Sequence, residues 1–277
     1  MSEPSSPPGK RRVLITGASG KVAQQIVPLL AGQFDLKLTD FRERPGSPQP
    51  LLLADLTRLD EALRIVNEVD AVVHLAIASG RDIAGKDIGA SQFTAEQRAA
   101  YEEAMLDVNV LGTYHVFEAA RRNGIKRVVF FSSILTVMGH PQYPKIDATA
   151  LPRPSNIYAC TKLFGEQLGE MYSRSFGMIV ICLRPGQPYP NIYPWEGKYL
   201  TDPGGRAMLV ANEDVAQAVA CALRVEGVGY GVYYVLSQCS TPRFDVSASA
   251  QIGYKPQMCF TDDGRVERIG TSEGESI

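Results

Sequence analysis

Short apolar runs alternate with longer segments of helical periodicity along most of the chain. Between the runs, apolar residues recur at helical spacing, as at Val22, Ile26 and Leu30. The runs that have the length and composition of buried strands lie at 12–16, 36–40, 51–55, 71–76, 128–131, 178–183 and 232–236. This alternation is typical of βαβ units. The sequence therefore predicts an α/β fold, a doubly wound parallel sheet of the Rossmann type, with all strands in one sheet.

A glycine-rich turn follows the first predicted strand and opens the first helix. Residues 16–23 read Thr-Gly-Ala-Ser-Gly-Lys-Val-Ala. Gly17 permits a tight turn, Gly20 lets the backbone approach a pyrophosphate, and Ala23 allows close packing of the helix on the sheet. A helix N-terminus also favours the negative charge of a phosphate. In this strand–turn–helix setting the motif predicts a dinucleotide site, although a turn that binds nothing is the alternative.

Asp40 ends the second predicted strand, about 20 residues after the first glycine. A carboxylate there accepts hydrogen bonds from both ribose hydroxyls and repels a 2′-phosphate. Arg42 lies close enough to favour NADP, but Asp40 itself favours NAD. Asp40 is alternatively a cap of the following loop. Asp55 ends the third strand and either hydrogen-bonds an adenine or is an ordinary strand-end aspartate.

Tyr158 and Lys162 are four residues apart in a helix predicted over 155–174, so they share one face of it. A neighbouring ammonium charge favours the ionised phenol, which lets the tyrosine exchange a proton. Ser132 and Ser133 end the fifth predicted strand, at the carboxyl edge where doubly wound sheets bind ligands. The sequence predicts a proton-transfer site at that edge.

Together these motifs resemble the extended short-chain dehydrogenase/reductase family, also described as NAD-dependent epimerases and dehydratases. The matching segments, in the family's order, are 16–23, Ala54-Asp55, His74-Leu75-Ala76, 109–113, Ser132-Ser133, Tyr158-x3-Lys162 and 183–186. The resemblance implies that Tyr158 is the acid/base, Lys162 its activator and a ligand of the nicotinamide ribose, and Ser133 a donor to the reacting oxygen. It implies cofactor contacts at Gly17, Ser19, Gly20, Lys21, Val22, Asp40, Asp55, Leu56, Leu75, Ala76, Asn109 and Lys162.

Within that family the chain is most similar to uronate dehydrogenases, which oxidise the C1 hemiacetal of a uronate to an aldarolactone. The likeness rests on Ser79 and on the stretches 132–158, 162–166 and 253–256. It implies a substrate site with Ser79, Ser133 and Ile134, although that subgroup has polar residues where this chain has Ile134 and Leu135. Arg206 is the candidate ligand of the substrate carboxylate, or else a solvent-facing arginine.

These motifs divide the chain into three predicted regions. Residues 1–11 are Ser/Pro-rich and expected to be disordered. Residues 12–185 form the predicted NAD-binding domain, which also holds the catalytic residues. Residues 186–277 form a small substrate-binding lobe, interleaved with the last strands of the sheet.

Composition narrows the function further. The chain has 277 residues, 45% of them hydrophobic, and a net charge of −2 without a basic block, so we expect no nucleic-acid partner. No signal peptide or membrane-length apolar run is evident, which favours a cytoplasmic protein. We expect no metal site, because nothing in the sequence places two more ligands beside His140.

The resemblance predicts a homo-oligomer, most simply a dimer formed by helices over 94–122 and 155–174. The predicted function is NAD-dependent oxidation of a sugar or sugar acid, a small-molecule substrate. A sugar epimerase or dehydratase is the first alternative, and a non-catalytic NAD(P)-binding sensor is the second.

Overall fold

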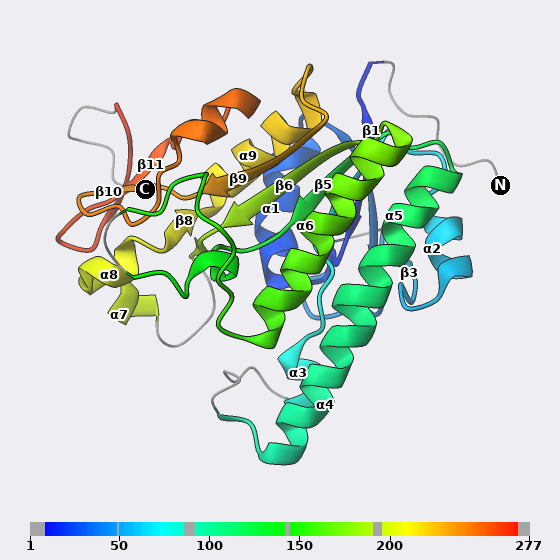
Figure 1. The fold of residues 1–277 in the computed structure, drawn as a ribbon, viewed down its shortest axis with the longest axis horizontal. Helices are drawn as coiled ribbons and strands as arrows, with labels where there is room; N and C mark the ends of the chain where they lie inside the picture. Colours follow the sequence, from blue (N-terminus) through cyan, green and yellow to red (C-terminus); the bar gives the residue numbers. More distant parts are fainter. Residues whose placement is uncertain (1–8, 49, 86–91, 142–144, 191–195, 271–277) are drawn as a thin grey trace.

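A computed structural model of the chain describes residues 9–48, 50–85, 92–141, 145–190 and 196–270. At its centre is a seven-stranded parallel sheet in the order β3-β2-β1-β4-β5-β6-β9 (Figure 1). The strands are β1 (Arg12–Thr16), β2 (Asp35–Asp40), β3 (Leu52–Leu53), β4 (Ala71–His74), β5 (Arg127–Phe131), β6 (Ile179–Pro185) and β9 (Tyr230–Val235). The predicted doubly wound fold is confirmed.

The strand order reverses between the neighbouring strands β1 and β4. After β1 the chain adds β2 and β3 on one side of the sheet, and after β4 it adds β5, β6 and β9 on the other side. In a doubly wound sheet, ligands bind at the carboxyl ends of the strands beside this reversal. The turn after β1, the segment after β4 and the end of β5 all reach this edge. The topology therefore assembles the predicted site residues on one side of the molecule.

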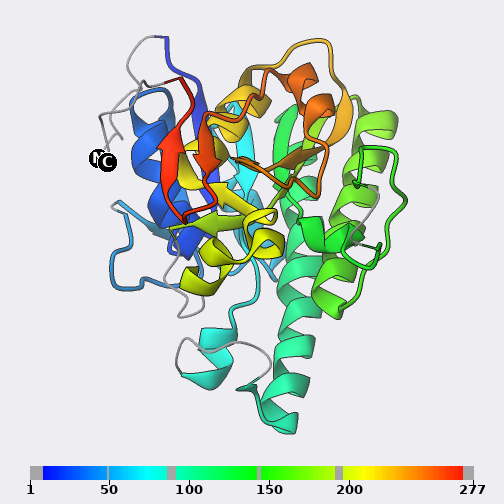
Figure 2. The ribbon, with the colours of Figure 1, turned by 90° about the vertical axis from the view of Figure 1, so that its left-hand side faces the viewer.

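Helices cover both faces of the sheet because the strand side chains alternate between them. Val13 and Ile15 pack with α1 (Lys21–Ala31) and α9 (Asn212–Arg224) on one face. Leu14 packs on the other face, against a cluster that includes residues of α2 (Leu59–Ile65), α5 (Thr113–Arg122) and α6 (Ile157–Phe176). Figures 1 and 2 show these two layers.

A long helical rod leads to α5. It begins with α4 (Ala95–Met105), capped by the Thr94 side chain, and passes through a π-helical segment, η2 (Leu106–Gly112). The rod projects beyond the sheet and α6 packs against it (Figure 2). The sequence predicted one helix over 94–122. The π segment was not predicted.

The C-terminal part adds two small sheets, so the prediction of a single sheet was wrong. One pairs β7 (Gln187–Tyr189) with β8 (Leu209–Ala211), and the other has β10 (Gln238–Cys239), β11 (Met258–Phe260) and β12 (Val266–Arg268). These strands have two or three residues each, too few to show alternation in the sequence. Short helices in and near this lobe are η3 (Ile134–Val137), α7 (Glu196–Thr201), α8 (Pro203–Arg206) and η4 (Ser247–Ile252). Another short helix, α3 (Gly80–Ala84), packs with α4.

β9 follows residue 185 in the chain and joins the main sheet. The division at residue 185 stays a prediction. Of the N-terminal segment expected to be disordered, residues 1–8 lie outside the described part of the chain. Among the described helices, none is long and apolar enough to cross a membrane.

Candidate active site

The glycine turn joins β1 to α1 at the carboxyl edge of the sheet. Gly17 has φ +70°, and a Cβ there would lie 2.7 Å from the Cα of Ala76, in the segment after β4. Only glycine satisfies both conditions. The Gly20 N–H donates to the Gly17 carbonyl at 2.9 Å, and α1 begins at Lys21. The turn thus places a helix N-terminus where a dinucleotide phosphate is expected to bind.

Asp40 ends β2 beside this turn. Its carboxylate accepts hydrogen bonds from the Ser19 N–H at 2.9 Å and from the Phe41 N–H at 2.7 Å. Burial nevertheless raises the pKa of Asp40, although these bonds and the charge of Arg44 oppose the rise. These backbone bonds hold the carboxylate beside the glycine turn, where the two hydroxyls of a ribose could donate to it. This arrangement fits the adenosine half of NAD.

Asp55 makes mainly local contacts. Its Oδ1 accepts hydrogen bonds from the N–H and the hydroxyl of Thr57, at 2.9 and 2.7 Å. Its own N–H donates to Glu61 of α2 at 2.8 Å. Leu56 is buried, and its carbonyl is 3.0 Å from the ring of His115. The predicted adenine contact of Asp55 and the predicted cofactor contact of Leu56 stay predictions.

His74 ties β4 to its neighbours rather than facing a substrate. Its Nδ1 lies 2.7 Å from the Thr16 hydroxyl, and its Nε2 lies 3.0 Å from the Thr113 hydroxyl. Burial, assisted by the charge of Lys162, lowers the pKa of His74 to about 3, so the ring is neutral. The Thr16 hydroxyl also accepts from the N–H groups of Leu75 and Ala76, which fixes the segment after β4.

Tyr158 and Lys162 lie in the first turns of α6, whose start is fixed by the Asn156 side chain. Lys162 is only 3% exposed, and its Nζ lies 5.6 Å from the centre of the Tyr158 ring. Burial lowers the pKa of Lys162 to about 7, although the charge of Glu166 opposes this. The helix can approach β5 because Gly165 has no side chain: a Cβ there would lie 2.1 Å from the Phe130 ring.

The two serines at the end of β5 point to different environments. Ser132 donates to the buried Glu166 carboxylate at 2.5 Å, so its hydroxyl is used inside the core. Ser133 caps η3, and its Oγ accepts from the Leu135 N–H at 3.2 Å. The Ser132 hydroxyl is thus committed to Glu166, whereas the role of Ser133 toward a substrate oxygen stays a prediction.

Asn109 links three parts of the site from within the π-helical segment η2. Its Oδ1 accepts from the Ala78 N–H at 2.8 Å, and its Nδ2 donates to the Thr161 hydroxyl at 3.1 Å. Thr161 directly precedes Lys162. Asn109 therefore holds the segment after β4 at a fixed place relative to α6. π segments occur frequently at functional sites.

A buried ion pair between α6 and β6 was not predicted. The Arg184 guanidinium donates to both carboxylate oxygens of Glu166, at 2.8 and 2.7 Å. Both residues are buried. Glu166 lies four residues after Lys162, on the same helical face. This spacing was the one feature of the sequence that could have indicated that Glu166 lies near the site. Its partner comes from β6, and no local pattern indicates such a pairing.

The residues predicted to bind substrate have other contacts in the structure. Ile134 is 4% exposed and belongs to an apolar cluster with Phe244 and Tyr234. The carbonyl of the half-buried Ser79 accepts from the Asp82 N–H at the start of α3. Arg206 lies on α8 in the small lobe and is buried, which excludes its being a solvent-facing arginine. Their substrate contacts stay predictions.

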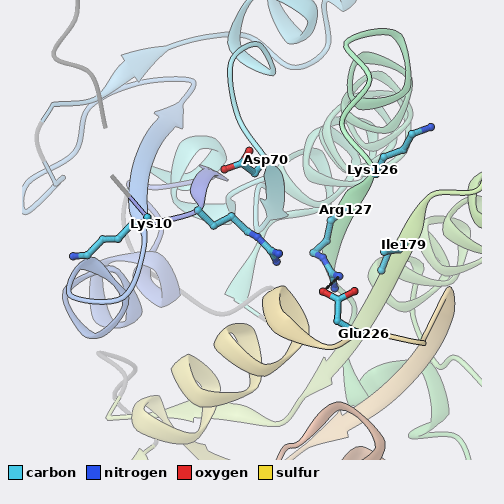
Figure 3. Close-up of a pocket in the computed structure, with 8 residues that line it drawn as sticks. Lys10, Asp70, Lys126, Arg127, Ile179 and Glu226 are labelled. Atoms are coloured by element: carbon cyan, nitrogen blue, oxygen red, sulfur yellow. Dashed lines mark hydrogen bonds and ion pairs between the residues drawn. The ribbon is translucent and has the colours of Figure 1, made fainter. Parts of the chain in front are cut away.

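A cavity of about 570 Å³ opens at the opposite, amino-terminal edge of the sheet (Figure 3). It is lined by Arg11, Lys126, Arg127, Glu226 and neighbouring residues, and is remote from the site described above. The Arg127 guanidinium donates to the carbonyls of Ala222 and Val225 at the end of α9, so it joins β5 to the C-terminus of that helix. Among the described residues, no three His, Cys, Asp or Glu side chains gather as a metal site.

Residues 13–192, more than half of the chain, match the model of the NAD dependent epimerase/dehydratase family. The chain belongs to this family. The resemblance stated from the motifs is therefore confirmed, as is the prediction of an enzyme of the extended short-chain dehydrogenase/reductase type. NAD is the cofactor for which the family is named.

Individual relatives cover most of the chain at modest identity. The chain is 28% identical to the uronate dehydrogenase of Pseudomonas putida over 253 residues, 89% of this chain and 84% of the relative. It is 28% identical to the NAD-dependent glucose-6-phosphate dehydrogenase of Haloferax volcanii over 265 residues, covering 88% and 92%. The solved uronate dehydrogenase of Agrobacterium tumefaciens superposes with a TM-score of 0.72 at 25% identity, covering 92% and 86%.

Proposed function

We propose that this enzyme is an NAD-dependent sugar dehydrogenase that oxidises the C1 hydroxyl of an aldose or a uronic acid. The observation that carries the proposal is the placement of Tyr158 beside the buried Lys162, on the sheet edge that holds the glycine turn and Asp40. The names of the relatives support it, because uronate dehydrogenase and glucose-6-phosphate dehydrogenase both denote sugar oxidation.

The residues around the glycine turn would hold NAD. Gly17, Ser19, Gly20, Lys21 and Val22 form the turn and the first helical residues, and Asp40 would accept both hydroxyls of the adenosine ribose. Asp40 disfavours a 2′-phosphate because two anions would be brought together. Leu75 and Ala76 line the edge after β4, and Lys162 would hold the nicotinamide ribose.

Bound NAD⁺ supplies the acceptor for the hydride that leaves C1. Tyr158, as phenolate, removes the proton from the C1 hydroxyl, and the adjacent Lys162 charge stabilises the phenolate. The Ser133 hydroxyl donates to the same sugar oxygen and orients it. Asn109 positions Lys162 through Thr161. Loss of both the proton and the hydride converts the hemiacetal to a lactone, so the atoms balance without water.

The uronate form of this proposal assigns the substrate carboxylate to Arg206. Its guanidinium donates to the Leu200 carbonyl at 2.9 Å and to Asp262 at 2.7 Å. Its Nε is buried and has no hydrogen-bond partner among the described residues. A substrate carboxylate would displace Asp262, whose side chain is 69% exposed and is readily rehydrated. A neutral aldose would leave the Arg206–Asp262 pair intact.

The test is the absorbance of NADH at 340 nm, with NAD⁺ or NADP⁺ and a panel of glucuronate, galacturonate, glucose, arabinose and glucose 6-phosphate. We expect NADH to accumulate with at least one of these sugars. Tyr158→Phe should lower turnover by at least about a hundredfold, because the general base is removed.

Tyr172→Phe is the matched control, since it alters another tyrosine of α6 that bonds Glu118 and lies away from the site. It should retain most of the turnover. Near-normal turnover of Tyr158→Phe would contradict the assignment. No free NADH with any sugar, from a protein that binds NAD⁺, would favour the epimerase alternative.

A further inference from the structure

Three charged side chains link segments that lie on either side of the glycine turn. Arg42 and Arg44 follow β2, and Asp82 lies on α3, after β4. Arg44 Nη2 donates to both carboxylate oxygens of Asp82, at 2.9 and 2.8 Å, and Arg42 forms an ion pair with the same carboxylate. We call these three residues the clasp.

The clasp crosses the cofactor edge of the sheet. β1 lies between β2 and β4, so a link between the segments after those two strands spans the carboxyl end of β1. That is where the turn at Gly17 lies. The clasp residues therefore lie next to the turn where the adenosine half of a dinucleotide is expected to bind.

The loop that carries the two arginines is anchored to the glycine turn. The Ser19 hydroxyl donates to the Arg42 carbonyl at 3.0 Å. The Arg44 N–H donates to the Ser47 hydroxyl at 2.8 Å, and that hydroxyl donates to the Ser19 hydroxyl at 2.8 Å. The loop is held close to Asp40, so two guanidinium groups lie near the carboxylate proposed to bind the ribose.

Two arginines at this place would ordinarily favour NADP. A guanidinium binds phosphate through paired, charge-assisted hydrogen bonds, and a 2′-phosphate would extend from the ribose that Asp40 faces. Here both guanidinium groups are directed to Asp82 instead. The Arg44 and Asp82 side chains are only 17% and 28% exposed, so this pair is partly shielded from water.

We propose that Asp82 is a specificity-determining residue, which favours NAD over NADP by holding Arg42 and Arg44 away from a 2′-phosphate. This inference rests on the proposed NAD dependence. Asp40 repels the 2′-phosphate directly, whereas Asp82 removes the cations that would compensate for that repulsion. Selectivity in this chain then depends on two aspartates, Asp40 at the end of β2 and Asp82 within the clasp.

The test is calorimetric titration of NAD⁺ and NADP⁺ into the full-length protein, a measurement of binding that needs no turnover. Asp82→Asn keeps the side-chain shape but removes the charge. We expect the variant to bind NADP⁺ about tenfold more tightly than the unaltered protein, because charge-assisted bonds to phosphate become available. Its affinity for NAD⁺ should change less than about threefold.

Asp263→Asn is the matched control. It removes the same charge from another aspartate–arginine pair, with Arg265 in the turn between β11 and β12, and should change neither affinity. The triple variant Arg42→Gln, Arg44→Gln, Asp82→Asn should lose the gain in NADP⁺ affinity. This loss would show that the gain of Asp82→Asn comes from the released arginines.

The outcomes separate the two proposals. If the unaltered protein fails to bind NAD⁺, the proposed function is wrong. If it binds NAD⁺ and folded Asp82→Asn binds NADP⁺ no more tightly, the role of Asp82 alone is wrong. If the triple variant keeps the gain, Asp82 acts only through its own repulsion of phosphate and the clasp is not the cause.

Discussion

The burial of Lys162 lowers the stability of the folded protein, because an ammonium group is removed from water. Lys162 is nearly inaccessible to water, and burial lowers its pKa from 10.5 to about 7. The unfolded chain therefore binds more protons than the folded chain between about pH 7 and pH 10.5. The free energy of unfolding should rise with pH across that interval. Below pH 7 the buried charge destabilises the fold in full.

Lys162→Met should therefore be more stable than the unaltered protein below pH 7, by a few kcal/mol at about 1.4 kcal/mol per pKa unit. The difference should shrink as the pH approaches 10.5, the unperturbed pKa of the lysine. Urea denaturation of both proteins at pH 6 and pH 10 measures it. Turnover should fall by at least about a hundredfold.

The exposed Lys255→Met serves as the comparison and should keep nearly normal turnover. A stability difference for Lys162→Met that is equal at the two pH values would contradict the account of a buried ammonium.

At the scale of elements, the helices were the most predictable. The predicted helix over 155–174 differs from α6 by two residues at each end. Its apolar stripe extends over several turns, which makes the period plain. The π segment has no distinct pattern in the sequence. Asn109 is distinguished by its hydrogen bonds to Ala78 and Thr161, which are distant in the chain. The strands of two or three residues were missed because alternation needs a longer run.

The helices also carry the predicted dimer interface. Leu106, Leu111 and Tyr114 on the rod and Phe164 on α6 each expose more than a third of their surface. The rod and α6 lie side by side on one face of the molecule (Figure 1). We propose that these side chains pack against those of a second copy, as the resemblance to the family implies.

Leu111→Glu should convert such a dimer to a monomer, because a charge would be buried at the interface without a partner. Sedimentation velocity measures the change. Leu53→Glu, at an exposed position on the edge strand β3, should leave the oligomer unchanged. A monomer before any substitution would contradict the predicted dimer.

At the scale of the whole molecule, the site is assembled from parts that are distant in the sequence. Tyr158 and Lys162 were found because they are four residues apart on one helix, and Asp40 because it ends a strand. The Glu166–Arg184 pair and the clasp were not found, because each joins residues from different elements. Such long-range pairs leave no periodic signal, and only the sheet order brings them together.

The central claim is that the chain oxidises a sugar at C1 and releases the reduced cofactor. The most direct measurement is the mass of the cofactor released when the protein acts on NAD⁺ and glucuronate deuterated at C1, with glucose deuterated at C1 as the neutral counterpart. The account predicts free NADH that carries one deuterium for each lactone formed from at least one of these sugars. Unlabelled cofactor that stays bound, together with an epimerised or dehydrated sugar, would contradict it.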